Sequence, residues 1–236
     1  MTNLFNTNRV PTWCAGCGNF IVKAALEKSL KNLKIKPQNV VVCFDIGCAG
    51  NMSDTLDVCT FETLHGRSVA VASGIKTVRP ELKVIAQAGD GGLLNEGLNH
   101  FIHAVQKDIP ITVILNNNFV FALTAGQKSS ATPKGETARS SRAKNEIAPL
   151  NAIDLALASG ARFLARVPEK EISLMRELVE KALGFNGFAL IEVIQPCRIW
   201  AKDFSHPSLK ILQNPATKRS EIAGRTELAG LLYLEE

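Results

Sequence analysis

The chain has 236 residues, of which 46% are hydrophobic and 21% are charged, and its formal net charge is +5. This composition is ordinary for a globular protein with a sizeable core, and no apolar run approaches the roughly 20 residues needed to cross a bilayer, so we expect no membrane span. Lys and Arg residues are spread along the sequence without interleaved aromatic residues, so we expect no nucleic-acid partner, whereas a basic surface would suit an acidic protein.

The first feature along the chain is a pair of cysteines, Cys14 and Cys17, in the stretch TWCAGCGN. The residues before it lack the apolar segment of a secretory signal, so we expect a cytoplasmic protein. In that reducing compartment the six cysteines of the chain are not expected to form disulfides. The pair alone fits a zinc knuckle, a redox dithiol or half of an iron–sulfur site.

Helical and strand patterns alternate after this pair. Apolar residues at helical spacing predict helices over residues 20–31, 68–78, 93–106, 151–160 and 170–184. A short, continuous apolar run predicts a buried strand over residues 40–45. Further strands are predicted over residues 83–88, 111–116, 161–167 and 188–194, the last of which closes the sheet. This order predicts an α/β fold, a three-layer parallel sheet with helices on both faces.

Three segments lack such a pattern. Residues 47–65 read as irregular, and residues 118–149 are rich in Gly, Ser, Thr and Lys, which is typical of a functional loop. From Ser205 onward the sequence is polar. We therefore predict a main domain over residues 1–204 and a C-terminal tail over residues 205–236 that packs on the domain or on a partner subunit.

The ends of three predicted strands carry unusual loops, namely DIGCAGN, GDGG and NNNF. Open parallel sheets bind ligands beyond the carboxyl ends of their strands. In GDGG, the glycines let the backbone approach a phosphate, and Asp90 would tolerate that phosphate if Mg²⁺ lay between them. Asn118 follows 28 residues later, an interval that fits one helix and one strand. We therefore expect Asp90 and Asn118 to meet at the same edge of the sheet.

These motifs resemble a known family. A GDG motif followed after roughly thirty residues by NN is the signature of thiamine diphosphate enzymes. The stretches WCAGCGN, DIGC, TLHGRSVAVASGIK, GDGGLLNEGLNHFIHAVQKDIPITVILNNN and LTAGQKSSATPKG resemble, in order, the beta subunit of 2-oxoacid:ferredoxin oxidoreductases over about residues 10–200. The resemblance implies the thiamine diphosphate-binding fold, in its diphosphate-binding domain.

The resemblance also implies the residues that bind the cofactor. Asp90, Asn118 and the backbone carbonyl of Val120 would coordinate Mg²⁺, which holds the diphosphate. His65 would be the catalytic residue, near the reacting centre or the phosphates. The other cofactor-binding residues implied by the family are, around the ring, Ile46, Gly47, Cys48 and Ala49, beside His65, Gly66 and Arg67, and at the phosphate end, Gly91, Gly92, Ala122 and Leu123.

In the same family pattern, four cysteines hold a [4Fe–4S] cluster. Cys14 and Cys17 correspond to the first two, and Cys48 and Cys197 complete the set. Cys43 and Cys59 are expected to pack as small hydrophobic residues. Zinc also accepts four cysteines, so zinc remains an alternative occupant.

The function implied is oxidative decarboxylation of a 2-oxoacid to acyl-CoA and CO₂. Thiamine diphosphate acts as electron sink, and the cluster passes electrons singly to ferredoxin, a commonly acidic protein. The family's activating glutamate belongs to a pyrimidine-binding domain, whereas this chain is long enough only for the diphosphate-binding domain. We therefore expect an alpha subunit as obligate partner, in a heterodimer or a dimer of heterodimers.

Several positions depart from the family pattern. Gly92 stands where an acid is frequent, Phe119 and Phe121 stand where Glu and Tyr are common, and Ala125 replaces a Gly. None of these removes a proposed ligand. Two alternatives stay open at this point: a non-redox thiamine diphosphate decarboxylase or synthase subunit, and a zinc-binding interaction module. The sequence does not identify the 2-oxoacid.

Overall fold

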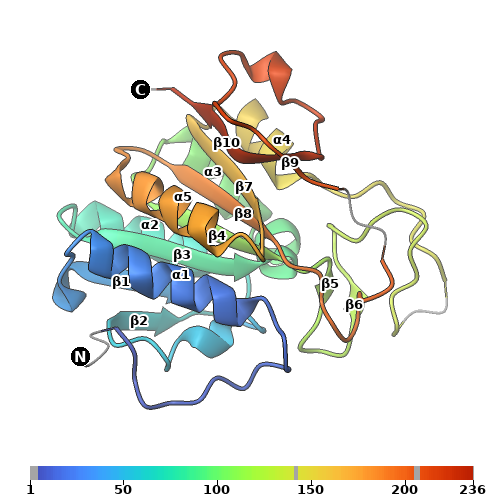
Figure 1. The fold of residues 1–236 in the computed structure, drawn as a ribbon, viewed down its shortest axis with the longest axis horizontal. Helices are drawn as coiled ribbons and strands as arrows, with labels where there is room; N and C mark the ends of the chain where they lie inside the picture. Colours follow the sequence, from blue (N-terminus) through green and yellow to red (C-terminus); the bar gives the residue numbers. More distant parts are fainter. Residues whose placement is uncertain (1–4, 141–142, 205–207, 236) are drawn as a thin grey trace.

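The computed structural model describes residues 5–140, 143–204 and 208–235. Within these residues the chain forms an eight-stranded sheet in the order β2-β1-β3-β4-β8-β7-β10-β9, with helices on both faces (Figure 1). Neighbouring strands are parallel except β10, which runs antiparallel to β7. The predicted α/β fold is confirmed.

The strands of this sheet are β1 (Val40–Phe44), β2 (Cys59–Glu62), β3 (Lys83–Gly89), β4 (Thr112–Asn117), β7 (Phe163–Pro168), β8 (Ala189–Ile194), β9 (Lys210–Ile211) and β10 (Leu228–Leu234). The α-helices are α1 (Asn19–Asn32), α2 (Ser68–Val78), α3 (Leu98–Gln106), α4 (Ala152–Ala158) and α5 (Ile172–Gly184). Short 3₁₀ turns occur at Pro37–Asn39, Gly50–Met52 and Arg219–Glu221.

The continuous apolar runs of the central strands are explained by burial on both faces. Every residue of β1, β4 and β8 is buried. In β1, Val41 and Cys43 enter the core beneath α2, α3 and α4, whereas Val40 and Val42 enter the core beneath α1 and α5. Figure 1 shows α1 and α5 side by side on the same face. The sheet therefore has two apolar cores, as the alternation of side chains in a strand requires.

Two sequence-based predictions of local structure were wrong. Residues 47–65 contain β2, an edge strand whose side chains are mostly exposed, so that no apolar pattern marks it. The helix predicted over residues 93–106 is split into a π-helical turn, Gly92–Glu96, and α3. Gly97 separates them because its backbone packs against Gly66 and Gly92, where an added Cβ would lie 2.8 Å and 2.7 Å from their carbonyl oxygens.

The C-terminal segment is also different from the prediction, because β8 does not close the sheet. Beyond β8 lie β7, β10 and β9, so residues after 204 extend the same sheet. Residues 205–207 lie outside the described residues. The boundary between a domain over residues 1–204 and a tail over residues 205–236 stays a prediction.

A buried ion pair joins this C-terminal segment to the centre of the sheet. Arg166 Nε lies 2.7 Å from Glu192 Oε2, and both side chains are 4% exposed. The Arg166 guanidinium also donates to the carbonyls of Arg225, Thr226 and Leu228. The Arg166 side chain thus joins the start of β10 and the two residues Arg225 and Thr226 before it to Glu192 of β8.

Replacing Arg166 with Met should lower the free energy of unfolding by about 3–5 kcal/mol, because it leaves the Glu192 carboxylate buried without its counter-charge. Urea unfolding at pH 7 measures the effect. The control is Arg79→Met in an exposed ion pair with Glu81, which should change stability by less than about 0.5 kcal/mol. A loss below about 1 kcal/mol in Arg166→Met would contradict the prediction.

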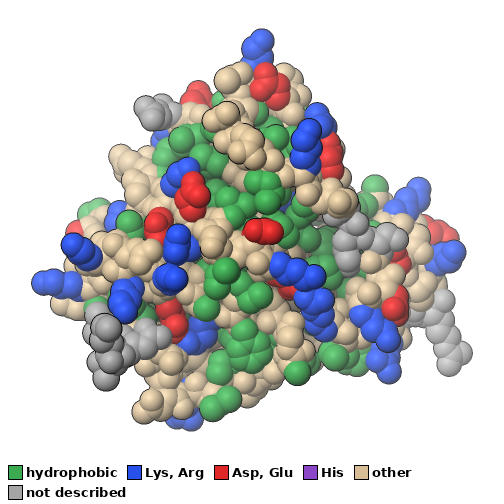
Figure 2. All heavy atoms as spheres, viewed as in Figure 1, with side chains coloured by type: hydrophobic (Ala, Val, Ile, Leu, Met, Phe, Trp, Pro, Cys, Tyr) green, Lys and Arg blue, Asp and Glu red, His purple; other side chains and the backbone are tan. Residues whose placement is uncertain are grey.

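The surface does not gather positive charge on the face seen in Figure 2. Lys and Arg side chains there are interspersed with Asp and Glu side chains and with apolar ones. In the part of the chain that the structure describes, no helix has the length and apolar character needed to cross a bilayer.

Candidate active site

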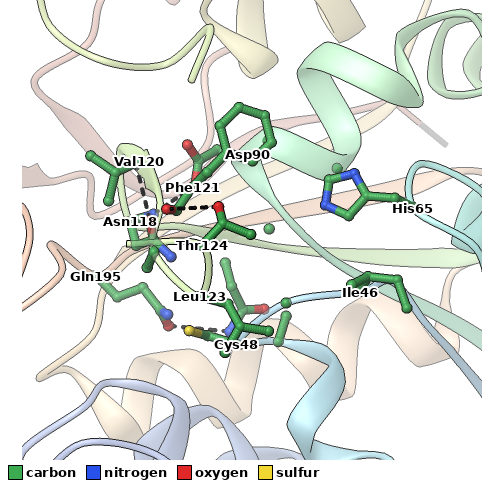
Figure 3. A pocket seen from close by; sticks show the side chains of 17 residues that line it. Ile46, Cys48, His65, Asp90, Asn118, Val120, Phe121, Leu123, Thr124 and Gln195 are labelled. Carbon is green, nitrogen blue, oxygen red and sulfur yellow. Dashed lines mark hydrogen bonds between the residues drawn. The ribbon is translucent and has the colours of Figure 1, made fainter. Parts of the chain in front are cut away.

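The carboxyl ends of β1, β3, β4 and β8 meet at one edge of the sheet and surround a cavity (Figure 3). The predicted magnesium ligands all line it. So do the residues predicted to bind the cofactor, except Gly66 and Arg67. The lining residues are Ile46, Gly47, Cys48, Ala49, His65, Gly89, Asp90, Gly91, Gly92, Asn116, Asn118, Val120, Phe121, Ala122, Leu123, Thr124 and Gln195.

Gly66 and Arg67 lie outside this cavity. Gly66 is buried behind it, and Arg67 is exposed and lines a separate surface hollow with Leu98 and Asn99. The turn that carries them still positions His65, whose side chain faces the cavity in Figure 3. His65 Nδ1 lies 3.0 Å from Glu96 Oε2.

Asp90 is a fully buried carboxylate at the end of β3. Its Oδ1 accepts the backbone N–H of Asn118 at 3.1 Å, and its Oδ2 accepts the hydroxyl of Ser129. Burial raises the pKa of Asp90 to about 6, although these hydrogen bonds favour the ionised form. A cation beside this carboxylate would supply the missing charge, so the site fits a metal ion chemically.

Asn118 and Val120 lie directly beside Asp90. The Asn118 Oδ1 accepts the backbone N–H of Val120 at 3.1 Å, and Val120 begins a short hairpin of β5 (Val120–Phe121) and β6 (Gln127–Lys128). The expected meeting of Asp90 and Asn118 at one edge is thus observed. The segment over residues 118–149 folds back so that Ser129 reaches the carboxylate.

The four cysteines that the family pattern selects line a second cavity of about 220 Å³ next to the first. They are Cys14, Cys17, Cys48 and Cys197, and Cys48 lines both cavities. Burial, followed by the three neighbouring thiols, raises the pKa of Cys48 to about 12, and burial also raises the pKa of Cys17. Thiols in this setting ionise when a cationic centre binds them.

The described side chains do not form a preformed site for a single metal ion. Among the described residues, no three His, Cys, Asp or Glu side chains are grouped closely enough to hold one ion.

The two remaining cysteines, Cys43 and Cys59, differ in whether they lie where the sequence predicted. Cys43 is buried within β1, which confirms that it packs as a small hydrophobic residue. The same prediction was wrong for Cys59, because β2 is the edge strand and exposes this side chain.

Buried amide side chains, which sequence reasoning missed, lie between the two cavities. Asn116 donates to Asn19 at 2.7 Å and to Gln195 at 3.2 Å, and Gln195 donates to Asn19 at 2.9 Å. Asn19 in turn donates to the Cys48 carbonyl at 3.0 Å. Each of these amides directly adjoins a motif, in CGN, NNN and QPC, and this adjacency was the only signal of their role.

Two departures from the family pattern have structural consequences. The Phe121 ring packs against Gly91, where an added Cβ would lie 2.2 Å from the ring. Phe121 thereby narrows the cavity opposite His65, whose ring centre is 5.9 Å away. Ala125 has φ +77°, a left-handed conformation in which Gly is favoured, so its replacement of Gly costs about 1 kcal/mol.

The fold and the two adjoining cavities define a thiamine diphosphate-binding domain. Residues 45–193 match the family described as thiamine pyrophosphate enzyme, C-terminal TPP binding domain. A relative from Aeropyrum pernix, 2-oxoacid:ferredoxin oxidoreductase 1, subunit beta, is 39% identical over 78% of this chain and 58% of its own length. The 2-oxoglutarate synthase subunit KorB of Archaeoglobus fulgidus is 35% identical over 92% of this chain and 81% of its own length.

A solved structure is similar throughout. It is 2-oxoglutarate:ferredoxin oxidoreductase from Magnetococcus marinus with 2-oxoglutarate, coenzyme A and succinyl-CoA bound, and it matches with a TM-score of 0.93 and 27% identity over 98% of this chain and 84% of that chain. The chain belongs to the family of 2-oxoacid:ferredoxin oxidoreductase beta subunits, as the resemblance of its motifs predicted. It spans about three fifths of the length of the relatives from Aeropyrum pernix and Saccharolobus solfataricus, 58% and 61%.

Proposed function

We propose that the chain is the beta subunit of an enzyme that oxidatively decarboxylates a 2-oxoacid to acyl-CoA and CO₂ and passes the electrons to ferredoxin. One observation carries the proposal. The cavity that contains Asp90 adjoins the cavity lined by four cysteines, and Cys48 belongs to both. A cofactor that releases electrons and a centre that accepts them would therefore be neighbours.

The diphosphate end of thiamine diphosphate would bind at the ends of β3 and β4. Asp90, Asn118 and the Val120 carbonyl would hold Mg²⁺, and the buried, uncompensated carboxylate of Asp90 supports a cation there. The backbone at Gly91 and Gly92, with Ala122 and Leu123, would line the phosphates. When bound, the cofactor supplies a nucleophilic carbon and an electron sink for loss of CO₂.

The ring end would lie against residues 46–49, which follow β1. His65 faces the same cavity, and its contact with Glu96 holds the imidazole in one orientation. We assign His65 a catalytic role in moving a proton at the reacting centre or in contacting the phosphates.

The second cavity would hold a [4Fe–4S] cluster through Cys14, Cys17, Cys48 and Cys197, one thiolate for each iron atom. The arrangement of these thiols around a cavity, next to the cofactor loop, supports a cluster that takes electrons one at a time. The net charge of +5 is compatible with an acidic ferredoxin as acceptor.

An alpha subunit with the pyrimidine-binding domain and its activating glutamate would complete the active site. Exposed apolar side chains beside the cavity, Ile46, Leu64 and Leu123, support a covering partner. The assembly would be a heterodimer or a dimer of heterodimers, with 2-oxoacid and coenzyme A as substrates. We place it in the cytoplasm, where the six free thiols would remain reduced.

Anaerobic co-expression of the chain with its proposed alpha subunit tests the function. The purified complex should contain iron, acid-labile sulfide, Mg²⁺ and thiamine diphosphate. With coenzyme A present, it should reduce a viologen dye on addition of one of pyruvate, 2-oxoglutarate or a branched-chain 2-oxoacid. The screen identifies which 2-oxoacid is used.

Two outcomes would contradict the proposal. Decarboxylation of a 2-oxoacid without iron and without dye reduction would identify a non-redox decarboxylase or synthase subunit. Bound zinc without iron or thiamine diphosphate would identify an interaction module. Handling in air must be avoided, since oxygen destroys exposed clusters.

A further inference from the structure

Asp45 is a carboxylate with 0% exposure at the end of β1, next to the proposed cofactor cavity. Its Oδ1 accepts the backbone N–H of Ile46 at 2.6 Å, and its two oxygens accept the N–H of Gly66 at 3.0 Å and 3.1 Å. This side chain thus joins the loop of residues 46–49 to the turn that carries His65.

The same carboxylate occupies the space beside Gly92 in the GDGG turn. A Cβ added to Gly92 would lie 2.2 Å from Asp45 Oδ2 and 2.6 Å from Cγ. Because real Cβ contacts are never so short, residue 92 can carry no side chain while Asp45 holds this position. A third loop of the cavity is therefore packed directly on the Asp45 carboxylate.

The three loops also contact one another around Asp45. A Cβ on Gly66 would lie 2.6 Å from the Glu96 carbonyl carbon, and Gly66 has φ +75°, which favours Gly. The turn that carries His65 therefore rests on the π-helical turn Gly92–Glu96. The backbones of these two turns touch, and the Asp45 side chain joins both of them to the loop of residues 46–49.

We propose that Asp45 is a positioning residue that sets the three cofactor-binding loops relative to one another, and that positions 45 and 92 form a coupled pair in which a single carboxylate fills the shared space. The part of the inference that concerns cofactor binding rests on the proposed function, whereas the contacts between positions 45, 66 and 92 do not depend on it. It also explains Gly92, which stands where the family frequently has an acid. In this chain the Asp45 carboxylate fills the space that a side chain at position 92 would need.

The coupling is tested by moving the acid from position 45 to position 92 in the full chain, purified together with its partner subunit. Asp45→Ala should weaken binding of Mg²⁺ with thiamine diphosphate by about tenfold or more, since it leaves the buried N–H of Gly66 and the partly buried N–H of Ile46 without an acceptor. Without cofactor, it should speed hydrogen exchange in peptides covering residues 62–68. Gly92→Asp should do the same, because two acids then compete for one space.

The double variant, Asp45→Ala with Gly92→Asp, should regain most of the affinity and of the exchange protection. Gly92 does not have positive φ, so an Asp is conformationally tolerated there. Asp45→Asn, which keeps one acceptor oxygen and the shape, should lie between wild type and Asp45→Ala and guards against a variant that fails to fold. Asp57→Ala, at an exposed carboxylate, is the control and should change neither readout.

Unchanged exchange in Asp45→Ala, or a double variant no better than the worse single one, would overturn the inference. Failure of the proposed function gives a different result. A wild-type protein that binds no thiamine diphosphate would overturn that function, whereas exchange measured without cofactor still decides the pairing of residues 45 and 92.

Discussion

Replacing Asp90 with Asn should abolish binding of Mg²⁺ and thiamine diphosphate and, at the same time, make the ligand-free protein more stable. The carboxylate is fully buried, and burial raises its pKa to about 6 from a usual value of 3.8. Because one pKa unit corresponds to about 1.4 kcal/mol, the buried charge costs the ligand-free fold on the order of 3 kcal/mol at neutral pH. An amide has a similar shape and no charge; its oxygen can still accept the Asn118 N–H, and its NH₂ group can donate to the Ser129 hydroxyl oxygen, which then accepts instead of donating.

The pH dependence of stability gives the sign of this effect. A carboxyl group whose pKa is higher in the folded than in the unfolded state binds more protons when folded between pH 3.8 and about 6. The contribution of Asp90 to the free energy of unfolding therefore falls as the pH rises through this window and stays low above it. In Asp90→Asn this component of the pH dependence should disappear.

Thermal and urea unfolding of the ligand-free protein between pH 4 and pH 8, with and without Mg²⁺ and thiamine diphosphate, measure both effects. The affinity for Mg²⁺ and thiamine diphosphate should fall more than about hundredfold. Loss of a residue that only supports a metal ligand typically costs about 10–100-fold, and Asp90 would bind the metal directly. Asp57→Asn, at an exposed carboxylate, serves as control and should retain binding. Retained binding in Asp90→Asn, or a ligand-free variant less stable than wild type at pH 8, would refute the assignment.

Much of the sheet was predictable because burial on both faces leaves a local mark. Strands such as β1 and β8 are short and rich in apolar residues, and the loops at the strand ends carried the recognisable motifs. The edge strand β2 left no such mark, since most of its side chains are exposed. The pairing of β10 with β7 depends on residues distant in sequence, such as Arg166, and no local pattern encodes it.

The candidate site was predictable where a motif and its residue types indicated metal or cofactor chemistry, and not where residues act only through their contacts. Asp90 and Asn118 were expected to meet because parallel strands end at one edge. Asp45, Ser129 and Gln195 were missed, since polar residues are expected at the surface and their burial arises only when distant loops pack together. The break at Gly97 was missed because the apolar spacing continues across it.

Serine substitutions at the four clustered cysteines should each remove the iron–sulfur centre, and they should differ in their effect on thiamine diphosphate. Cys14 lines only the second cavity, so Cys14→Ser should lose the cluster and keep the affinity for Mg²⁺ and thiamine diphosphate within about twofold. Cys48 lines both cavities. Cys48→Ser should therefore lose the cluster and also lower the affinity for Mg²⁺ and thiamine diphosphate.

Iron and sulfide analysis of anaerobically purified protein, together with visible absorbance, measures the loss. Wild type should contain about four iron atoms per chain, and each clustered-cysteine variant should contain close to none. Cys59→Ser is the matched control, because Cys59 is exposed like Cys14 but lies on the edge strand β2, outside the cysteine-lined cavity. If the four variants keep iron and colour while Cys59→Ser does not, the cluster is held elsewhere. If all proteins contain zinc instead, the second cavity does not hold an electron-transfer centre, and the oxidative step assigned to this chain fails with it.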